Sequence, residues 1–313
     1  MALTDEETKK LEHTAEQIRE TIIEMLVAAG SGHTAGPLGM ADIFAAFYFH
    51  ILRHDPKHPE WPERDRLILS NGHIVPVRYA AMAHAGYFPV KECMTLRKFG
   101  SRLQGHPERL RLPGLETTSG PLGEGLSQAS AMAYAFSKMT RFGGRETSRK
   151  EESGRGEAAP ALEPRTSNLV PRVFCLMGDG EQDEGSVWEA AMWAGKQKLA
   201  NLTAVIDRNN IQIDGMTEDV MPLENLRAKY EAFNWHVLEV NGNDIPAFVA
   251  AVEEADAIYE KPVVIIAHTI PGKGVPEIEF DYHWHGKPPT KEEGKRFLKE
   301  IRTMGGKVPH EYA

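Results

Sequence analysis

The chain has 313 residues, of which 41% are hydrophobic, 36 are basic and 45 are acidic. This length and hydrophobic content can bury one large α/β core or two smaller ones, so a globular enzyme is the default class. The net charge of −9 argues against nucleic acid or an anionic membrane as the main partner, and phosphorylated substrates would require a local positive charge.

Cysteine content and the start of the chain bear on the cellular compartment. Cys93 and Cys175 are the only two cysteines, too few and too far apart for a disulfide framework or a cysteine metal site. The opening MALTDEETKK lacks the basic and apolar regions of a signal peptide. No apolar run approaches the ~20 residues that a membrane span requires. We therefore expect a cytoplasmic protein that has no membrane partner.

The N-terminal part of the chain predicts two helices and a strand. Thr4 and Glu7 form a capping box ahead of a helix with an apolar stripe, which leads to the loop SGHTAGPLG. A second helix is predicted over about 40–52, and a strand over 66–69 leads to SNGH. Two loops that carry a histidine thus follow regular elements.

Strand and helix patterns alternate in the rest of the chain. The predicted strands are VFCLM, LTAVID, HVLEV and VVIIAH. Helical patterns lie between them, in SVWEAAMWAGKQKL, LENLRAKYEAF and IPAFVAAVEEADAIY, and a final amphipathic helix is predicted after WHGKP. This alternation predicts an α/β fold with a doubly wound, mostly parallel sheet and helices on both faces. Ligands of such sheets lie beyond the carboxyl ends of the strands, where GDG, DRNN and AHTIPGKG fall.

One segment does not follow this pattern. Residues 143–168 contain no aromatic residue, a single leucine and many charged, glycine and proline residues. Such a composition cannot bury enough apolar surface to offset the entropy of ordering the chain. We interpret it as a flexible surface insertion within one domain that spans residues 1–313. The alternative is that its basic residues contact a partner.

The stretch GDGEQDEG and the later DRNNIQIDG together predict a metal and diphosphate site. Asp179 can supply a carboxylate, Asn209 an amide oxygen and Ile211 a backbone carbonyl. Mg²⁺ (or Ca²⁺) takes such oxygen ligands together with phosphate oxygens and water. The glycines beside Asp179 permit close approach of a diphosphate, and the following helix directs its N-terminus to the same place. For GDG alone, the alternative is an acidic turn that favours the helix dipole.

Several motifs resemble those of one enzyme family. GDG followed by NN resembles the cofactor motif of thiamine diphosphate enzymes. SGHTAGPLGM, ILSNGH, QGHPE, TTSGPLGEGLSQASAMA, GDGEQDEGSVWEAAMWAG and WHGKP resemble, in order, the motifs of transketolases. The resemblance runs from about residue 10 to 290 and implies the thiamine diphosphate-binding fold. It covers only the first domain of that family, and so implies the N-terminal subunit of a split transketolase.

The resemblance assigns cofactor and metal roles. Asp179, Asn209 and the Ile211 carbonyl match the metal ligands of the family. His73 and Gly180, together with Asn209, match residues beside the diphosphate. These roles suit a neutral imidazole that donates a hydrogen bond, at His73, and a backbone N–H without a neighbouring side chain, at Gly180. The implied cofactors are therefore thiamine diphosphate and Mg²⁺ (or Ca²⁺).

It also assigns residues to the pyrimidine and substrate ends of the site. Gly120 and Leu122 match the loop whose backbone meets the aminopyrimidine ring. His33, His106 and His285 match the histidines that line the substrate channel, where they would bind donor hydroxyls and move protons near neutral pH.

The other acidic residues of GDGEQDEG receive at most one role from the resemblance, and two positions of the chain differ from the family pattern. Glu184 matches a carboxylate in the contact between subunits. Glu181 and Asp183 have no assignment beyond a helix N-terminus. The family usually has Pro at Thr34 and Gln at Glu124, and these two changes affect the expected substrate preference.

The implied activity is the transfer of a two-carbon ketol unit from a ketose phosphate to an aldose phosphate. In the family, the carboxylate that acts on the aminopyrimidine belongs to the second domain. We therefore expect a partner, a C-terminal subunit that carries the pyrimidine-binding domain, in a heterotetramer. The alternatives are a subunit like that of 1-deoxyxylulose-5-phosphate synthase, one like the α chain of a 2-oxo acid dehydrogenase, or a noncatalytic chain that binds the cofactor as a scaffold.

Overall fold

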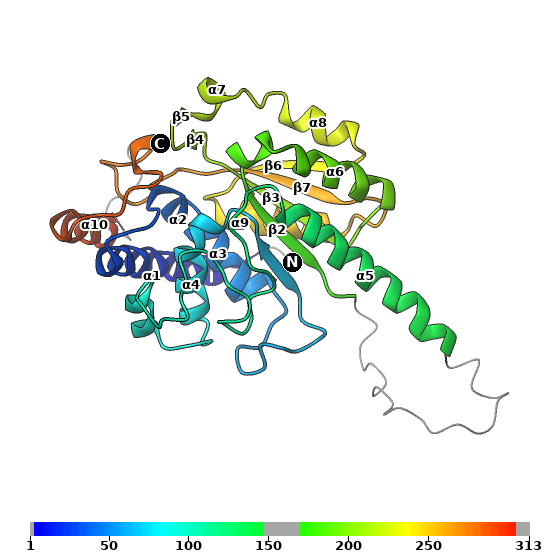
Figure 1. The fold of residues 1–313 in the computed structure, drawn as a ribbon, viewed down its shortest axis with the longest axis horizontal. Helices are drawn as coiled ribbons and strands as arrows, with labels where there is room; N and C mark the ends of the chain where they lie inside the picture. Colours follow the sequence, from blue (N-terminus) through cyan, green and yellow to red (C-terminus); the bar gives the residue numbers. More distant parts are fainter. Residues whose placement is uncertain (1–2, 147–169, 305–313) are drawn as a thin grey trace.

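A five-stranded sheet lies at the centre of the structure, a computed structural model that describes residues 3–146 and 170–304 (Figure 1). Its strands are β1 (Arg66–Leu69), β2 (Val173–Gly178), β3 (Leu202–Arg208), β6 (His236–Asn241) and β7 (Val263–His268). They lie in the order β1-β2-β3-β7-β6, and every pairing is parallel. The strands predicted from the sequence are confirmed.

Helices cover both faces of this sheet (Figure 1). One face carries α1 (Asp5–Ala29), α3 (Ala41–Ala46), α4 (Val75–His84) and α9 (Ile245–Asp256). The other carries α5 (Gly125–Glu146), α6 (Gly185–Gln197) and α8 (Leu226–Ala232). Successive residues of a strand point to opposite faces of the sheet. Phe174 and Leu176 pack in the core on the side of α1, whereas Cys175 and Met177 pack in the core on the side of α6. The predicted doubly wound architecture is confirmed.

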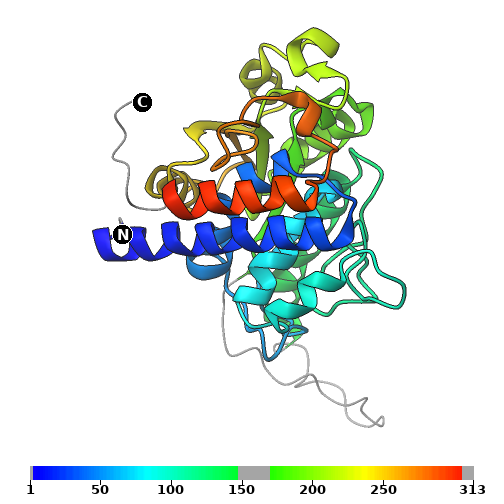
Figure 2. The same cartoon turned by 90° about the vertical axis from the view of Figure 1, so that its left-hand side faces the viewer.

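The first helix begins and ends as its sequence predicts. The backbone N–H of Glu7 donates to Thr4 Oγ1 at 3.3 Å, and the backbone N–H of Thr4 donates to Glu7 Oε2 at 2.9 Å. This is the expected capping box. Gly30 ends the helix in the left-handed conformation, with a φ of 64°. Figure 2 shows α10 (Lys291–Met304) lying along this helix, so the two ends of the described chain pack together.

Two other expectations are modified. The helix predicted over about 40–52 is α3 followed by one turn of π-helix (Phe47–Ile51), preceded by the separate short helix α2 (Ala35–Gly39). Helix α5 continues to Glu146, so residues 143–146 of the predicted insertion are helical. Its remainder, 147–168, lies outside the described residues. Within the described ranges, both cysteines are unpaired and buried, and none of the helices has the length and apolarity to cross a bilayer.

Candidate active site

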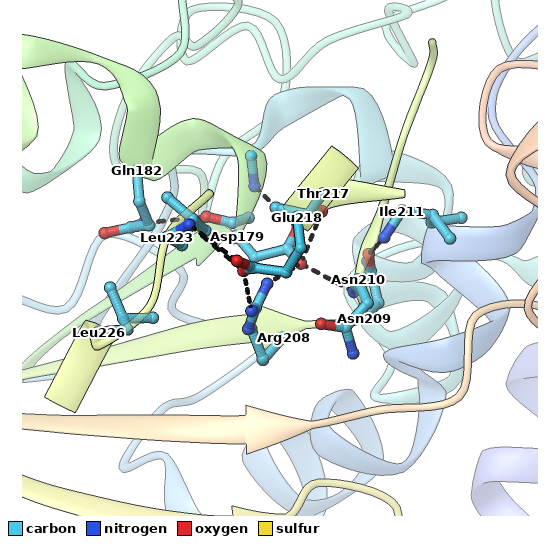
Figure 3. Close-up of polar contacts among 12 residues, drawn as sticks. Asp179, Gln182, Arg208, Asn209, Asn210, Ile211, Thr217, Glu218, Leu223 and Leu226 are labelled. Atoms are coloured by element: carbon cyan, nitrogen blue, oxygen red, sulfur yellow. Dashed lines mark hydrogen bonds and ion pairs between the residues drawn. The ribbon is translucent and has the colours of Figure 1, made fainter. Parts of the chain in front are cut away.

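The loop after β2 brings Asp179 beside Arg208, the last residue of β3, and beside Asn210 in the loop that follows it (Figure 3). Asp179 is 2% exposed. Its Oδ2 accepts hydrogen bonds from the Asn210 backbone N–H at 2.8 Å, from Thr217 Oγ1 at 3.1 Å and from Arg208 Nη1 at 3.1 Å. Its Oδ1 accepts from the Gly180 backbone N–H at 2.8 Å. Because three donors occupy Oδ2, Oδ1 is the oxygen that is more open to a cation.

Asn209 is fixed by a hydrogen bond at each end of its amide. Its Oδ1 accepts from the Ile211 backbone N–H at 3.0 Å, and its Nδ2 donates to Asp207 Oδ2 at 2.9 Å. Asp207 also accepts from the Thr269 hydroxyl. Burial raises the pKa of Asp207 to about 7. Asp207 was not predicted from the sequence, although it is the acidic residue of the DRNN motif and ends a run of apolar strand residues; it is itself buried.

Arg208 is a second residue that the sequence analysis missed. It is 4% exposed and forms ion pairs with Asp179, with Glu218 and with Glu224, the last at 3.1 Å. Figure 3 shows its guanidinium between the Asp179 carboxylate and Glu218. Burial raises the pKa of Asp179, and the nearby Arg208 opposes that shift. The arginine thus partly neutralises the carboxylate.

The donor set fits one kind of metal site. In the described part of the chain, no three His, Cys, Asp or Glu side chains gather as a metal-binding group. The predicted ligands include a single carboxylate, at Asp179, with the Asn209 amide oxygen and the Ile211 carbonyl. Ile211 belongs to a two-stranded hairpin of β4 (Ile211–Gln212) and β5 (Gly215–Met216). Such ligands suit Mg²⁺ held jointly with a diphosphate rather than a cation held by protein alone.

Three predicted histidines form a cluster. The ring centroids of His33 and His73 are 4.8 Å apart, those of His33 and His285 are 5.5 Å apart, and those of His73 and His285 are 5.2 Å apart. Burial, aided by the positive charges of a protonated His285 and of Arg97, lowers the pKa of His33 to about 4. Burial also lowers the pKa values of His73, His285 and His106. These imidazoles are therefore neutral at pH 7 and can each donate and accept.

The cluster contains histidines for which the sequence predicts two different roles. His73 was predicted to lie beside the diphosphate and the other two in the substrate channel, yet their rings are neighbours. His106 lies near the same cluster, because a Cβ at Gly72, next to His73, would lie 3.2 Å from Pro107 Cδ, next to His106. His283 differs: it is exposed and its Nδ1 lies 2.7 Å from Asp281 Oδ1.

Thr34, a departure from the family pattern, links two of these motifs. Its hydroxyl donates to the Lys287 carbonyl at 2.6 Å. This bond holds the loop that carries His33 against the WHGKP segment that carries His285. Proline has no hydroxyl, so it could not make this contact at position 34.

The predicted pyrimidine loop borders open space. A Cβ atom at Gly120 would meet no heavy atom within 4 Å, and Leu122 is 37% exposed. Gly180 differs, since a Cβ there would lie 2.7 Å from the Gln212 side chain.

Four polar atoms in or next to the histidine cluster are buried and lack a hydrogen-bond partner among the described residues: Asn71 Oδ1, His33 Nδ1, Ser119 Oγ and His285 Nδ1. Unpaired buried polar atoms are costly, so this region fits a polar ligand.

The acidic turn after β2 divides into two parts. Asp183 and Glu184 are exposed, and Glu184 immediately precedes α6. Its exposure is compatible with the predicted subunit contact. Glu181 is 2% exposed and points into the protein, where it accepts several hydrogen bonds. The acidic residues of this turn therefore have no single role.

Comparison with known proteins defines the class to which this fold and site belong. Residues 11–311 match the family described as transketolase, thiamine diphosphate binding domain. The chain belongs to this family, so the family resemblance seen in its motifs is confirmed.

Two relatives match along almost their whole length. One is the 6-deoxy-6-sulfo-D-fructose transketolase subunit SqwG of Clostridium sp. (strain MSTE9), 38% identical over 295 residues that cover 94% of this chain and 97% of the relative. The other is a subunit of the apulose-4-phosphate transketolase of Phocaeicola vulgatus, 36% identical over 94% of this chain and 95% of the relative. The chain is accordingly a transketolase subunit of the split type.

Longer transketolases match over less than half of their length. Mouse transketolase is 35% identical over 93% of this chain and 42% of its own length. The structure of transketolase from Leishmania mexicana superposes with a TM-score of 0.83 at 30% identity, covering 97% of this chain and 42% of that one. The chain thus spans less than half the length of these transketolases.

Proposed function

We propose that this subunit, with thiamine diphosphate, Mg²⁺ and a second chain that carries the pyrimidine-binding domain, transfers a two-carbon ketol unit from a ketose phosphate to an aldose phosphate. The observation that carries the proposal is that Asp179 follows β2 while His73, with the other two histidines beside it, follows the neighbouring parallel strand β1, so both groups lie at the carboxyl edge of the sheet. Oxygen ligands can bind the Mg²⁺ that accompanies a diphosphate, and neutral imidazoles can hydrogen-bond to the hydroxyls of a sugar and transfer protons.

Each group then has a definite task. When bound, thiamine diphosphate supplies the carbon nucleophile of the reaction. Asp179, Asn209 and the Ile211 carbonyl hold the metal that binds its diphosphate. The neutral rings of His33 and His285 hydrogen-bond to the hydroxyls of the donor and can accept or return a proton during transfer. Their low pKa values keep them neutral at physiological pH.

The names of two relatives support a substrate class for this proposal. One is named for a sulfonated ketose and the other for a ketose phosphate. We therefore include a sulfonated ketose as a second candidate donor, because the 38% identical relative carries that name. Both candidates are ketoses with an anionic end group. The transketolase names of the relatives favour this reaction over those of 2-oxo acid dehydrogenase or 1-deoxyxylulose-5-phosphate synthase subunits.

The test is a ketol-transfer assay with saturating thiamine diphosphate and Mg²⁺. The chain is assayed alone, and again after mixing with a separately purified chain that carries a pyrimidine-binding domain. We expect turnover from the mixture only, in a heterotetramer, with both ketose phosphates and a 6-sulfo ketose tried as donors. Full turnover by the chain alone would show that the shared-site proposal is wrong.

A further inference from the structure

Glu181 accepts hydrogen bonds from three separate segments at the carboxyl edge of the sheet. It lies in the 3₁₀ turn Gly180–Asp183 that follows β2. Its Oε1 accepts from the Ser70 hydroxyl and from the Gly123 backbone N–H at 2.7 Å. Its Oε2 accepts from the Gly178 backbone N–H at 2.9 Å. One carboxylate therefore joins the end of β1, the end of β2 and the loop that precedes α5.

Ser70 extends this connection into α5. The Gly125 backbone N–H donates to Ser70 Oγ at 3.0 Å, and Ser70 Oγ donates to Glu181. Gly125 is the first residue of α5, so the helix start is tied to the same carboxylate. The loop also fits closely against the turn after β2, because a Cβ at Gly123 would lie 2.7 Å from Glu184 Cβ.

The carboxylate has no cationic partner to explain its burial. No lysine or arginine in the described part of the chain forms an ion pair with Glu181. Its charge is compensated by hydrogen bonds from two backbone N–H groups and one hydroxyl. Hydrogen bonds to a carboxylate are charge-assisted and therefore strong. A buried carboxylate in this situation is costly unless the geometry of its donors is maintained. Its contacts therefore favour one position of the 120–123 loop relative to the turn that contains Asp179.

We propose that Glu181 is a positioning residue that holds the 120–123 loop at a fixed place relative to the diphosphate site, so that both ends of one cofactor are bound at once. This inference rests on the proposed function, in which the loop meets the pyrimidine ring and Asp179 holds the metal. Glu181 itself touches neither cofactor nor substrate in this proposal.

Glu181→Gln is the primary variant, because it keeps the size of the side chain but replaces one acceptor oxygen by a donor NH₂. Asp183→Asn is the matched control: it removes the same charge from the same turn, and Asp183 is exposed. Hydrogen exchange of the full chain without cofactor should show amides in the 119–127 segment exchanging at least ~5-fold faster in Glu181→Gln. The control should exchange as the wild type does.

Ligand binding provides a second readout. With Mg²⁺ present, and with the partner chain added, Glu181→Gln should bind thiamine diphosphate about 10-fold more weakly than wild type, as expected for loss of a charge-assisted contact. Inorganic pyrophosphate, which lacks the pyrimidine ring, should bind within about 2-fold of wild type. If Glu181 only stabilised the fold, its substitution would change the affinities for thiamine diphosphate and for pyrophosphate by the same factor.

The outcomes separate this inference from the proposed function. Wild-type exchange and wild-type thiamine diphosphate affinity in Glu181→Gln would overturn the inference, as would an equal loss of affinity for both probes. Failure of the wild type to bind thiamine diphosphate would instead contradict the proposed function. If Glu181→Gln does not fold, Ser70→Ala takes its place, since it removes the hydroxyl between Glu181 and Gly125. Unchanged exchange at 119–127 in Ser70→Ala would then overturn the inference.

Discussion

Several polar residues at the carboxyl edge of the sheet are held in place by hydrogen bonds and ion pairs. The sequence predicts some of these residues as parts of a site and not others. Asp179 and Asn209 were predicted because oxygen-bearing residues in GDG and DRNN have a recognisable spacing. Arg208, Asp207 and Glu181 were not, because their roles depend on which distant groups they meet. Arg208 reaches Glu218 and Glu224, and Glu181 reaches Ser70, 111 positions away. Such contacts follow from the tertiary fold and have no local pattern.

Replacing Asp179 with Ala should weaken the binding of thiamine diphosphate in the presence of Mg²⁺ by at least ~10-fold. The reason is that the only charged ligand of the predicted metal site is removed. Titration with the cofactor at several Mg²⁺ concentrations measures the effect, with Asp183→Asn as the control for charge. An affinity equal to that of the wild type would show that the metal is not held by Asp179.

The histidine cluster predicts a pH dependence of stability. Burial lowers the pKa of His33 from 6.5 to about 4. Between these values the unfolded chain binds a proton at His33 and the folded chain does not, so the free energy of unfolding decreases as the pH falls through this window. Each bound proton contributes ~1.4 kcal/mol per pH unit, so the His33 contribution is about 2 kcal/mol between pH 6.5 and pH 5.

His33→Asn should therefore lose less stability than the wild type on acidification from pH 7 to pH 5. Urea unfolding of both proteins at the two pH values measures this difference. Buried carboxyl groups with raised pKa values, such as Asp207, act in the opposite direction but equally in both proteins. Parallel losses in the two proteins would contradict a buried, neutral His33.

Elements of the fold are predicted well where a period is clear. The five strands and helices α1, α6, α8, α9 and α10 were predicted because strands are short apolar runs and these helices have an apolar stripe or cap. Helices α4 and α5 and the β4–β5 hairpin were not. Nearly all of α4 is buried, so no polar face marks its period, and each hairpin strand has only two residues. The change to π-helix after Ala46 likewise has no sequence period of its own.

Helix α6 offers a test of packing within one element. A Cβ at Gly195 would lie 1.9 Å from the Phe233 carbonyl oxygen, whereas a Cβ at Gly185 would meet nothing within 4 Å. Gly195→Ala should therefore destabilise the protein by about 2 kcal/mol or more, because the backbone of a neighbouring segment must move. Gly185→Ala, in the same helix, should be neutral or stabilising by ~0.5 kcal/mol. Chemical denaturation decides between these outcomes, and equal effects of the two variants would argue against the close contact of α6 with Phe233.

In the proposed function, the whole molecule forms one side of a site that a second chain completes. Asp179 and Asn209, the histidine cluster and the partly exposed 120–123 loop all follow strands at the carboxyl edge of the sheet or lie beside residues that do, and Gly120 borders open space. The chain also spans 42% of the length of the mouse and Leishmania transketolases that it matches. The names of two relatives as transketolase subunits are compatible with the partner chain of the proposed function.

Cofactor affinity should therefore depend on the partner. Thiamine diphosphate should bind the chain alone at least ~10-fold more weakly than it binds the mixture with a chain carrying a pyrimidine-binding domain, because the second chain adds contacts to the other end of the cofactor. Pyrophosphate should show a much smaller difference. Calorimetric titration of both ligands, with and without the partner, measures the two ratios. Equal affinity for thiamine diphosphate in both samples would contradict a shared site.

The bond from Thr34 to the Lys287 carbonyl joins residues 253 positions apart. It has a consequence for the order in which the site forms during synthesis. The groups around Asp179 and Asn209 are all present once the chain has been made as far as Thr269, the last of them to be synthesised. His33 and His73 are made far earlier but must wait for the WHGKP segment. A growing chain therefore contains every group around Asp179 and Asn209 before it contains His285, so the histidine cluster is the later of the two to be completed.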